Sequence, residues 1–356
     1  MTDPRLDPPP GLLVRWTAAA AQRLLRQPPG PPAPGEIRRI LVVRTDDRVG
    51  NALLTIPFVR ALQRAFPAAE VDLLLARRQA RVAVGLPGLR VVAFDKRDAF
   101  AHPVRFLRFL RQLRASYDVV FDAAHWHAFS LTSALLSRWA AARFTVGFAR
   151  GPATIYGTAV ALPAPGVPDV AARLALGAPL GVHLAASLLE TSLGRGPSPV
   201  SGRFAALNPG ARKAGHRWPA ARFGAVARGL RERLGLRSVV FWGPGEEELA
   251  RAAVAASAGA AELGPATDLD ALAAAFRKSD LVVTNDTGPM HLAAACGAKV
   301  VAVFLDEAGL RWAHPGPRFA AVVAPADEQP VLEAAGRLLD TAQREAQPPQ
   351  SSEGSP

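Results

Sequence analysis

The sequence predicts an α/β protein with two doubly wound halves, because short apolar runs alternate with helix-like stretches in two separate parts of the chain. Runs such as VVAVF are apolar without a break, which is typical of parallel strands buried on both faces. Polar and glycine-containing loops follow several of these runs. In the first half we expect strands at 37–44, 71–76, 91–94, 117–123 and 143–148, and helices at 51–66, 103–116 and 130–142. In the second half we expect strands at 204–210, 238–242, 281–285, 300–304 and 320–324, and helices from 219, 246 and 268, near 291 and over 327–346.

Proline-rich tails and a linker divide the chain. Residues 1–36 have proline clusters at both ends, and the piece between them could form a basic amphipathic helix or a mobile tail. We expect an N-terminal α/β domain over 37–193 and a linker over 194–202, where GRGPSPVSG is rich in Pro and Gly. A C-terminal α/β domain over 203–346 should follow, its last helix packing toward the N-terminal half. Residues 347–356 should be disordered.

The chain is strongly basic, with 42 Lys+Arg against 30 Asp+Glu and a formal net charge of +12. This charge favours anionic partners such as nucleotides, sugar phosphates or an acidic lipid surface, and no basic–aromatic nucleic-acid module is present. No apolar run approaches the roughly 20 residues that span a bilayer, and the start does not read as a secretory signal. The single cysteine, Cys296, excludes an internal disulfide and suggests a reducing cytoplasm. It lies in an Ala-rich helix, where we expect a small buried residue and not a nucleophile.

The most informative stretch is TNDTGPMH, between an apolar strand and a helix. A helix N-terminus after a parallel strand presents free N–H groups and the positive end of a dipole to phosphate or carboxylate. Gly288 permits close approach of the backbone, and Pro289 suits the first helical turn. Asp286 and Thr287 could act only as helix caps, but His291, one turn into the helix, favours an anion site.

Two other loops follow strands in the same half. NPGARKAGHRWP carries Lys213, His216 and Arg217, and FWGPGEEE has Gly243 at its turn and three glutamates at the start of a helix. Ligands of such sheets bind beyond the carboxyl ends of the strands. A basic loop, an anion-binding helix end and a carboxylate able to hold ribose hydroxyls describe a site for a nucleotide diphosphate. Two of the three glutamates are expected to be no more than favourable first-turn charges.

Other chemistries match the sequence less well. There is no GxxxxGK[ST], and WGPGEEE lacks the third Gly of a dinucleotide fingerprint. His125 and His127 flank a Trp without a third metal ligand at convincing spacing, so we expect a packing role. Asp268 and Asp270 resemble a metal-binding D-x-D pair, but they begin a helix, so a capping role is the simpler interpretation.

In the first half, the loop RTDDRVGN joins the first strand to the first helix and holds Asp46, Asp47, Arg48 and Gly50. One interpretation is that Asp47 caps the helix and the glycine makes a turn. The other is a functional loop, because two acids and an arginine lie at the mouth of a parallel sheet.

Four motifs in this order resemble glycosyltransferase family 9, the ADP-heptose:lipopolysaccharide heptosyltransferases and their relatives, over roughly residues 38–345. They are ILVVRTDDRVGNALLTIPFVRAL, LNPGARKAGHRWPAARF, FWGPGEEE, and VVTNDTGPMHLAAACGAKVVAVF followed by RWAHPGP. The resemblance implies a GT-B architecture, in which two Rossmann-like domains face each other across a cleft. It implies inverting transfer of a sugar, expected to be heptose, from an ADP-sugar or other nucleotide-diphospho-sugar. The acceptor would be a lipopolysaccharide core or another cell-surface glycan at the cytoplasmic membrane face, with neither a cofactor nor a divalent metal required.

The resemblance carries over donor-pocket roles to Asp286, Thr287, Gly288 and His291, and a role near the ribose to Glu246 or Glu247. The full candidate donor-binding set is Asn208, Lys213, His216, Arg217, Gly243, Glu246, Glu247, Asp286, Thr287, Gly288 and His291.

Two positions depart from the family pattern. His216 stands where the family usually has Lys. Asn51 stands where the family has the Asp expected to be the base, in a loop that looks one residue longer. An amide cannot accept the proton of an attacking hydroxyl. The catalytic candidates are therefore Asp46, Asp47 and Asn51, with one of the two acids as the base, and Asn51→Asp should leave activity similar or higher.

Two alternatives stay open. If neither acid acts as the base, the chain would be a non-catalytic nucleotide-sugar-binding or assembly protein derived from this family. A nonhydrolysing sugar epimerase of similar architecture would need a second acid pair that the sequence lacks. The basic segments 11–27 and 106–114 also predict reversible, peripheral association with an anionic membrane surface.

Overall fold

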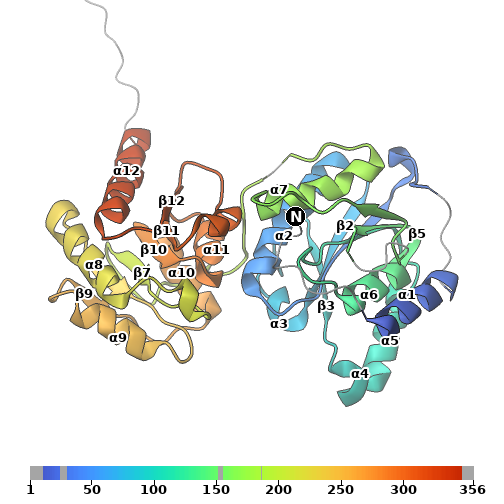
Figure 1. Cartoon of the computed structure of the whole chain (residues 1–356), viewed down its shortest axis with the longest axis horizontal. Coiled ribbons are helices and arrows are strands. Elements are labelled where there is room, and N and C mark those ends of the chain that lie inside the picture. Colours follow the sequence, from blue (N-terminus) through green and yellow to red (C-terminus); the bar gives the residue numbers. More distant parts are fainter. Residues whose placement is uncertain (1–10, 25–29, 151–154, 186, 347–356) are drawn as a thin grey trace, which may run out of the picture. The chain divides into compact units, whose positions relative to one another are not determined.

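The computed structural model describes residues 11–24, 30–150, 155–185 and 187–346. The chain divides into two compact units, residues 1–192 and 193–356 (Figure 1). Each unit is built on one six-stranded parallel sheet whose strands alternate with helices. The predicted α/β class with two doubly wound halves is therefore confirmed. The predicted tail at 347–356 lies outside the described residues.

The N-terminal sheet has the strand order β3-β2-β1-β4-β5-β6, and all five pairings are parallel. Its strands are β1 (Arg39–Arg44), β2 (Glu70–Ala76), β3 (Arg90–Phe94), β4 (Tyr117–Asp122), β5 (Ala141–Phe148) and β6 (Thr158–Val160). Its α-helices are α1 (Leu12–Leu24), α2 (Val49–Ala65), α3 (Arg77–Ala80), α4 (Asp98–Ala101), α5 (Pro103–Leu113), α6 (Leu131–Ala140) and α7 (Asp169–Leu174). Short 3₁₀ turns lie at Pro34–Glu36 and Ala175–Leu180.

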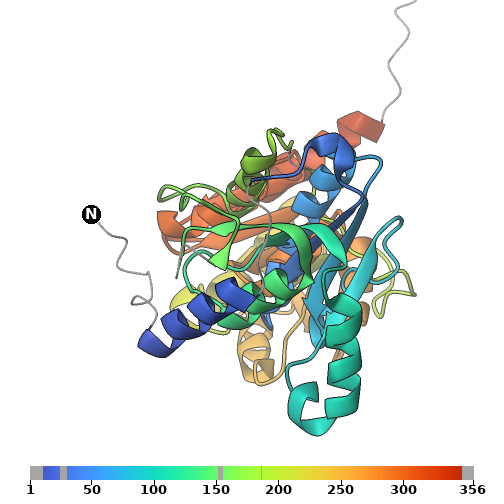
Figure 2. The same cartoon turned by 90° about the vertical axis from the view of Figure 1, so that its right-hand side faces the viewer.

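The central strand β1 explains why its sequence shows no alternation. Residues Ile40 to Val43 are all completely buried, because helices cover both faces of this sheet (Figure 2). On one face, Leu41 and Val43 pack in a cluster that includes residues of α5 and α6. On the other, Phe58 of α2 meets Phe121 of β4 edge to face, with ring centroids 5.3 Å apart. α1 covers residues 12–24, within the segment for which the sequence allowed a basic amphipathic helix or a mobile tail, and it contacts α6.

The C-terminal sheet repeats this plan with the strand order β12-β11-β10-β7-β8-β9, again all parallel. Its strands are β7 (Ala205–Asn208), β8 (Ser238–Val240), β9 (Ala261–Leu263), β10 (Leu281–Asn285), β11 (Val300–Phe304) and β12 (Phe319–Val323). Its α-helices are α8 (Ala220–Leu234), α9 (Glu247–Ala255), α10 (Leu269–Lys278), α11 (Gly288–Ala295) and α12 (Gln329–Ala346). Short 3₁₀ turns lie at Ala214–His216 and Glu307–Trp312.

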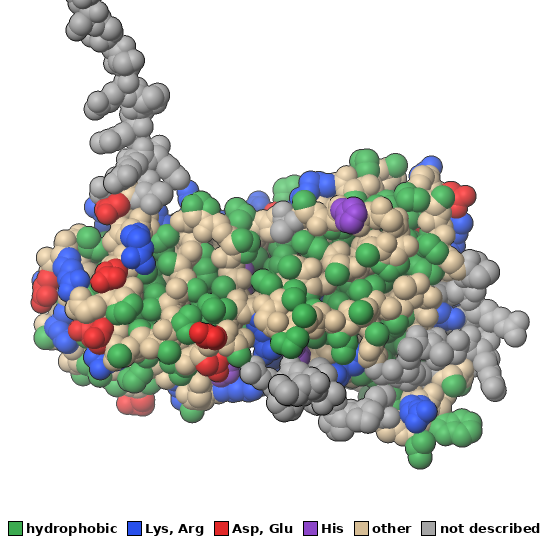
Figure 3. Space-filling view, turned by 45° about the horizontal axis from the view of Figure 1, so that its top comes forward, with side chains coloured by type: hydrophobic (Ala, Val, Ile, Leu, Met, Phe, Trp, Pro, Cys, Tyr) green, Lys and Arg blue, Asp and Glu red, His purple; other side chains and the backbone are tan. Residues whose placement is uncertain are grey.

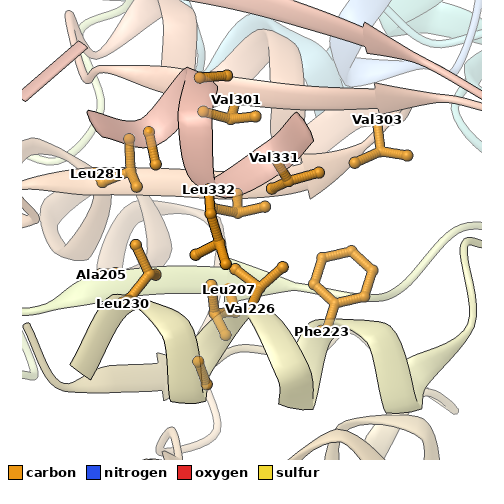
Figure 4. Packing of buried hydrophobic residues seen from close by; sticks show 14 of the residues in the cluster. Ala205, Leu207, Phe223, Val226, Leu230, Leu281, Val301, Val303, Val331 and Leu332 are labelled. Carbon is orange, nitrogen blue, oxygen red and sulfur yellow. The ribbon is translucent and has the colours of Figure 1, made fainter. Parts of the chain in front are cut away.

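One apolar cluster holds α8 and α12 on this sheet (Figure 4). Its members include Phe223 and Leu230 of α8, Leu207 of β7, and Val331 and Leu332 of α12. Complete burial of each such side chain is worth roughly 1.5–3 kcal/mol. The last helix, α12, packs on α8, β11 and β12 of its own unit, and its expected packing toward the N-terminal half stays a prediction. The amphipathic pattern predicted the helix correctly but could not say which sheet receives its apolar face.

Three further features bear on function. No helix in the described part of the chain is both long and apolar enough to cross a membrane. Residues 1–192 carry 24 Lys+Arg against 13 Asp+Glu, whereas residues 193–356 carry 18 against 17. The charge of +12 thus belongs almost entirely to the N-terminal unit. On the face shown in Figure 3, acidic side chains accordingly gather over the C-terminal unit and are sparse on the N-terminal one.

Candidate functional site

The C-terminal unit brings the predicted loops to one edge of its sheet. β7 and β10 are neighbours at the centre, and the chain runs outward from β7 to β8 and β9 and, on the other side, from β10 to β11 and β12. The loops after β7, β8 and β10 all leave from carboxyl ends of parallel strands. This reversal of strand order is the place where open α/β sheets bind ligands.

The start of α11 is open. Thr287 occupies the N-cap position of α11 and has an extended backbone, but its side chain makes no capping hydrogen bond. Its hydroxyl instead donates to the carbonyl oxygen of Asn285 at 3.3 Å. Gly288 borders open space, since a Cβ added there would meet no atom within 4 Å. The interpretation of Thr287 as a cap fails, and the helix start remains accessible to a ligand.

Asp286 lies beside the basic loop that follows β7. One of its oxygens is 3.5 Å from Nδ1 of His216. Burial raises the pKa of Asp286 to about 6, although the neighbouring imidazole of His216 opposes the rise. A carboxyl group that titrates near neutrality therefore borders the predicted anion site.

The side chain of Asn285 fixes this loop to the end of β10. Its Oδ1 accepts from the backbone N–H of Trp218 at 3.1 Å, and its Nδ2 donates to the carbonyl oxygen of Pro209 at 2.8 Å. The Trp218 indole is buried and donates to the carbonyl oxygen of Pro325 at 3.1 Å. Sequence reasoning gave Asn285 no role, because an Asn at a strand end is also an ordinary loop residue.

The predicted cations of this loop differ in their surroundings. Arg217 is half-buried, and its Nε donates to the carbonyl oxygen of Ala211 at 2.7 Å. Lys213 is exposed. Asn208 is buried at the end of β7 and donates from Nδ2 to the carbonyl oxygen of Phe241 at 3.5 Å, which links β7 to the strand beside it.

The structure distinguishes between the first two glutamates of the triplet. Glu246 directs its carboxylate to the sheet edge, where Oε2 accepts from the N–H of Gly243 at 3.1 Å. A Cβ at Gly210 would overlap the same carboxylate, so a larger residue there would displace the Glu246 side chain from this position. Glu247 instead pairs with Arg251 one turn further along α9, at 2.5 Å. Of these two acids, Glu246 is therefore the one placed at the site.

His291 is buried in α11 and belongs to a histidine pair. Its Nδ1 lies 2.8 Å from Nε2 of His314. Burial lowers the pKa of His291 to about 4, so the ring is neutral at physiological pH. Its ring also meets that of Trp312 edge to face, with centroids 6.4 Å apart. His291 thus ties α11 to the RWAHPGP segment and carries no charge toward the anion site.

In the N-terminal unit, the loop after β1 orders one of its two acids. Asp46 forms an ion pair with Arg44, and its Oδ1 accepts from Nδ2 of Asn51 at 2.9 Å and from the N–H of Arg48 at 3.2 Å. Its side chain is 35% exposed. Asp47 is exposed and engages Gln79 only through its backbone carbonyl oxygen, at 3.0 Å. Arg48 is the residue at the N-terminal cap of α2 and no side chain caps it, so the interpretation of Asp47 as a cap is wrong.

Arg44, the last residue of β1, holds Asp46 in this loop. It is completely buried, and both it and Arg173 of α7 donate to the carbonyl oxygen of Ala123 at the end of β4. Arg173 also binds Asp169 through two hydrogen bonds, of 2.7 and 3.0 Å. Burial, together with the charge of Arg173, lowers the pKa of Arg44 to about 10, although Asp46 and other acids oppose the shift. Sequence reasoning missed Arg44, although a charged residue ending an apolar strand is a visible signal.

His125, His127, Asp268 and Cys296 have structural surroundings and do not belong to either candidate site. The rings of His125 and His127 stack with centroids 4.4 Å apart, and no group of three or more His, Cys, Asp or Glu in the described residues is placed to hold a metal. Asp268 caps α10 by accepting from the N–H of Ala271 at 2.9 Å, as predicted. Cys296 is buried, and burial raises the pKa of its thiol to about 12, as expected of a packing residue.

Comparison with known proteins places the chain in a family. The model of glycosyltransferase family 9 (heptosyltransferase) matches residues 106–339, and the chain belongs to this family. Its members include enzymes that transfer sugars, and this chain is a glycosyltransferase with the GT-B fold. No curated protein sequence matches it.

Several solved structures share the fold. A family 9 glycosyltransferase from Veillonella parvula superposes with a TM-score of 0.67 at 21% identity, over 88% of this chain and 100% of the other. The E. coli heptosyltransferase WaaC with ADP gives 0.64 at 24% identity, over 86% and 100%. The E. coli ADP-heptose lipopolysaccharide heptosyltransferase II gives 0.58 at 21% identity, over 86% and 100%.

Proposed function

We propose that this glycosyltransferase moves a sugar, with inversion, from an ADP-sugar to a lipopolysaccharide core or related cell-surface glycan. Heptose is the proposed sugar. Structures of similar fold are described with ADP or as ADP-heptose transferases, which supports an ADP-linked donor. The observation that carries the proposal is the donor edge of the C-terminal unit, where an open helix start, a basic loop and the Glu246 carboxylate converge.

Each part of this edge suits one part of the donor. The start of α11 at Thr287 and Gly288 offers backbone N–H groups and the helix dipole to the diphosphate. Lys213 and Arg217 supply cationic charge, and we assign His216 to the same role in place of the lysine usual in the family. Glu246, already oriented by Gly243, would accept hydrogen bonds from the ribose hydroxyls.

The N-terminal unit supplies the base. Asp46 is the acid whose oxygens are held by Arg44 and Asn51, whereas Asp47 points into solvent. In the proposed step, Asp46 takes the proton of the acceptor hydroxyl as that oxygen bonds to the anomeric carbon. The bond from the anomeric carbon to the diphosphate oxygen breaks on the opposite face, and the nucleoside diphosphate leaves with the electron pair.

Protein groups carry the leaving charge in this mechanism. Lys213, Arg217 and the start of α11 provide fixed positive charge and dipoles where the diphosphate charge develops. We therefore propose that neither a cofactor nor a divalent metal is needed. Transfer measured with excess EDTA should match transfer with added Mg²⁺, and a rate that collapses on chelation would contradict this part of the proposal.

The second candidate is a non-catalytic nucleotide-sugar-binding protein, and Asn51 is the residue that favours it. An ordered Asp46 beside Asn51 weighs against it, because a carboxylate remains at the loop. The decisive experiment titrates ADP- and UDP-sugars calorimetrically and then assays transfer to lipopolysaccharide-core acceptors. Binding with transfer supports the enzyme, binding without transfer supports the adaptor, and no nucleotide binding at millimolar concentration would refute both.

The acceptors of this reaction are lipid-linked, so we propose a cytoplasmic enzyme that works at the inner face of the cytoplasmic membrane. Its contact with the membrane would be peripheral and reversible. The basic character of residues 1–192 supports this placement.

A further inference from the structure

The helices α4 and α5 project from the rest of the N-terminal unit (Figures 1 and 2). Their exposed side chains form a basic and apolar surface. These helices follow β3, at the edge of the sheet. We call this the α4–α5 surface and define it as Lys96, Arg97, Phe100, Val104, Leu107, Arg108 and Arg111.

Its apolar members are exposed to an unusual degree. Phe100 is 92% exposed, Val104 69% and Leu107 56%. The helix does not need them for its own packing, because Phe106 and Phe109 on the inner side pack against the core of the unit. Single exposed apolar residues are ordinary, but three within eight residues on a projecting pair of helices, Phe100 in α4 and Val104 and Leu107 in α5, indicate a surface that binds something apolar.

The cations of this surface pair with no acid among the residues that the structure describes. Some exposed arginines elsewhere do pair with carboxylates, as Arg143 does with Glu36 and Arg237 with Glu262. Within the described residues, no ion pair involves Lys96, Arg97, Arg108 or Arg111.

The acids nearest to this surface, Asp95 and Asp98, form ion pairs with other arginines. Asp98, the only acid between 96 and 114, is buried and binds Arg77 and Arg105. Asp95, which borders the surface, lies 3.5 Å from Arg77. The surface therefore presents uncompensated positive charge around its exposed apolar side chains.

We infer that the α4–α5 surface binds an anionic lipid bilayer, with Phe100, Val104 and Leu107 entering the headgroup region among the four cations. Val104, Leu107, Arg108 and Arg111 share one face of α5, and Lys96, Arg97 and Phe100 lie at or in the neighbouring α4. Exposed helices on which cations alternate with apolar residues are the pattern of elements that lie in a membrane interface. An acidic protein would match the charge but would bury such projecting apolar residues only in a complementary groove. A bilayer needs no such complementarity.

The placement agrees with the chemistry of the unit. β3 is parallel to β1, so its carboxyl end and Asp46 lie at the same edge of the sheet. α4 and the first turn of α5 follow that end, and Asp98 is bound there to Arg77 in α3. A lipid-linked acceptor would thus meet the enzyme at the edge that carries the base. Only this last point rests on the proposed function, because membrane binding itself requires no transfer.

The test is sedimentation of the full-length protein with vesicles of phosphatidylcholine alone or with 30% phosphatidylglycerol. We expect binding to the anionic vesicles only, falling as salt rises. Arg108→Glu combined with Arg111→Glu should weaken it at least 25-fold, since each cation near such a surface contributes about fivefold. Phe100→Ser with Leu107→Ser should weaken it at least tenfold and leave the salt dependence in place.

Matched controls separate this surface from general charge and exposure. Arg231→Glu with Arg233→Glu on α8, and Leu188→Ser at a site that is 68% exposed, should leave binding within twofold of the parent. Leu12→Ser with Trp16→Ser tests α1, whose exposed residues are the rival contact. The inference is overturned if the parent binds no vesicles, if the α4–α5 variants bind normally, or if the controls fall equally. Calorimetric binding of ADP by every variant reports separately on the proposed function.

Discussion

The two units share one fold and place their key loops at the same kind of sheet edge, yet they build those edges from different chemistry. At the donor edge, Asn285 holds the loop after β7 with neutral hydrogen bonds, and a neutral His291 braces α11. At the edge after β1, buried charged side chains hold the structure together, because Arg44 and Arg173 both donate to the carbonyl oxygen of Ala123. The difference teaches what each edge must provide. The donor edge presents an exposed cation, Lys213, to a polyanionic ligand, whereas at the edge after β1 the buried Arg44 pairs with the carboxylate of Asp46.

The sharpest way to break this comparison is to remove that carboxylate. Asp46→Asn should lower turnover by roughly 100-fold or more, the usual range for loss of a general base. ADP affinity should stay unchanged, because the donor edge belongs to the other unit. Asp47→Asn is the matched control in the same loop and should turn over normally. Normal turnover in both variants, with folding verified by thermal melting, would place the base elsewhere.

The next effect concerns Asn51, whose amide donates to Asp46. Asn51→Ala should lower turnover by about 10- to 100-fold, because a hydrogen bond to a charged group is worth roughly 1.5–3 kcal/mol. Asn51→Asp should also turn over more slowly than the parent at neutral pH, whereas the sequence alone led us to expect similar or higher activity. Two carboxylates would then share a proton, so activity should recover as pH rises. A pH–rate profile for Asn51→Asp identical to that of the parent would show that Asn51 does not position Asp46.

A smaller effect is expected at the donor edge. Glu246→Ala should weaken ADP binding by roughly tenfold, the value of one or two hydrogen bonds to ribose. Glu247→Ala removes a neighbouring carboxylate that pairs only with Arg251, and should leave ADP affinity unchanged. Calorimetric titration of the two variants compares them directly. Equal losses would mean that the local charge matters and not the orientation of Glu246.

The sequence was sufficient for the features that local patterns control. Buried strands such as β1 and β10 read as unbroken apolar runs, and Asp268 carried a clear capping signal. Short elements escaped notice, because β6 and β9 have three residues each and are only partly buried. A three-residue strand has too few side chains to show a period.

The candidate site was predicted in outline, and its details depended on contacts between distant residues. The loops of the donor edge were recognisable, but the choice of Glu246 over Glu247 depends on Gly210, 36 positions earlier in the chain. The choice of Asp46 over Asp47 likewise depends on Arg44 and its burial against Ala123. Such pairings come from tertiary structure, which no local pattern encodes.

The smallest expected effect is the pH dependence of donor binding, and it arises from Asp286. Burial raises the pKa of this carboxyl to about 6 in the folded protein, against an ordinary value of 3.8. Because the folded state holds the proton more tightly, stability associated with Asp286 is complete below about pH 4 and is lost as pH rises through about 6. Above pH 6 the ionised group also repels the diphosphate, so ADP affinity should fall several-fold between pH 5.5 and 7.5 at constant ionic strength.

Asp286→Asn separates this carboxyl from His216, its neighbour at 3.5 Å. The amide cannot ionise, so the variant should be more stable than the parent at pH 7 by about 1–3 kcal/mol, and equally stable near pH 4. If Asp286 sets the pH dependence, ADP affinity in the variant should no longer fall through pH 6. If the fall persists unchanged in Asp286→Asn but disappears in His216→Gln, the imidazole controls it. The donor edge would then depend on the His216 side chain, much as the edge after β1 depends on its buried arginines.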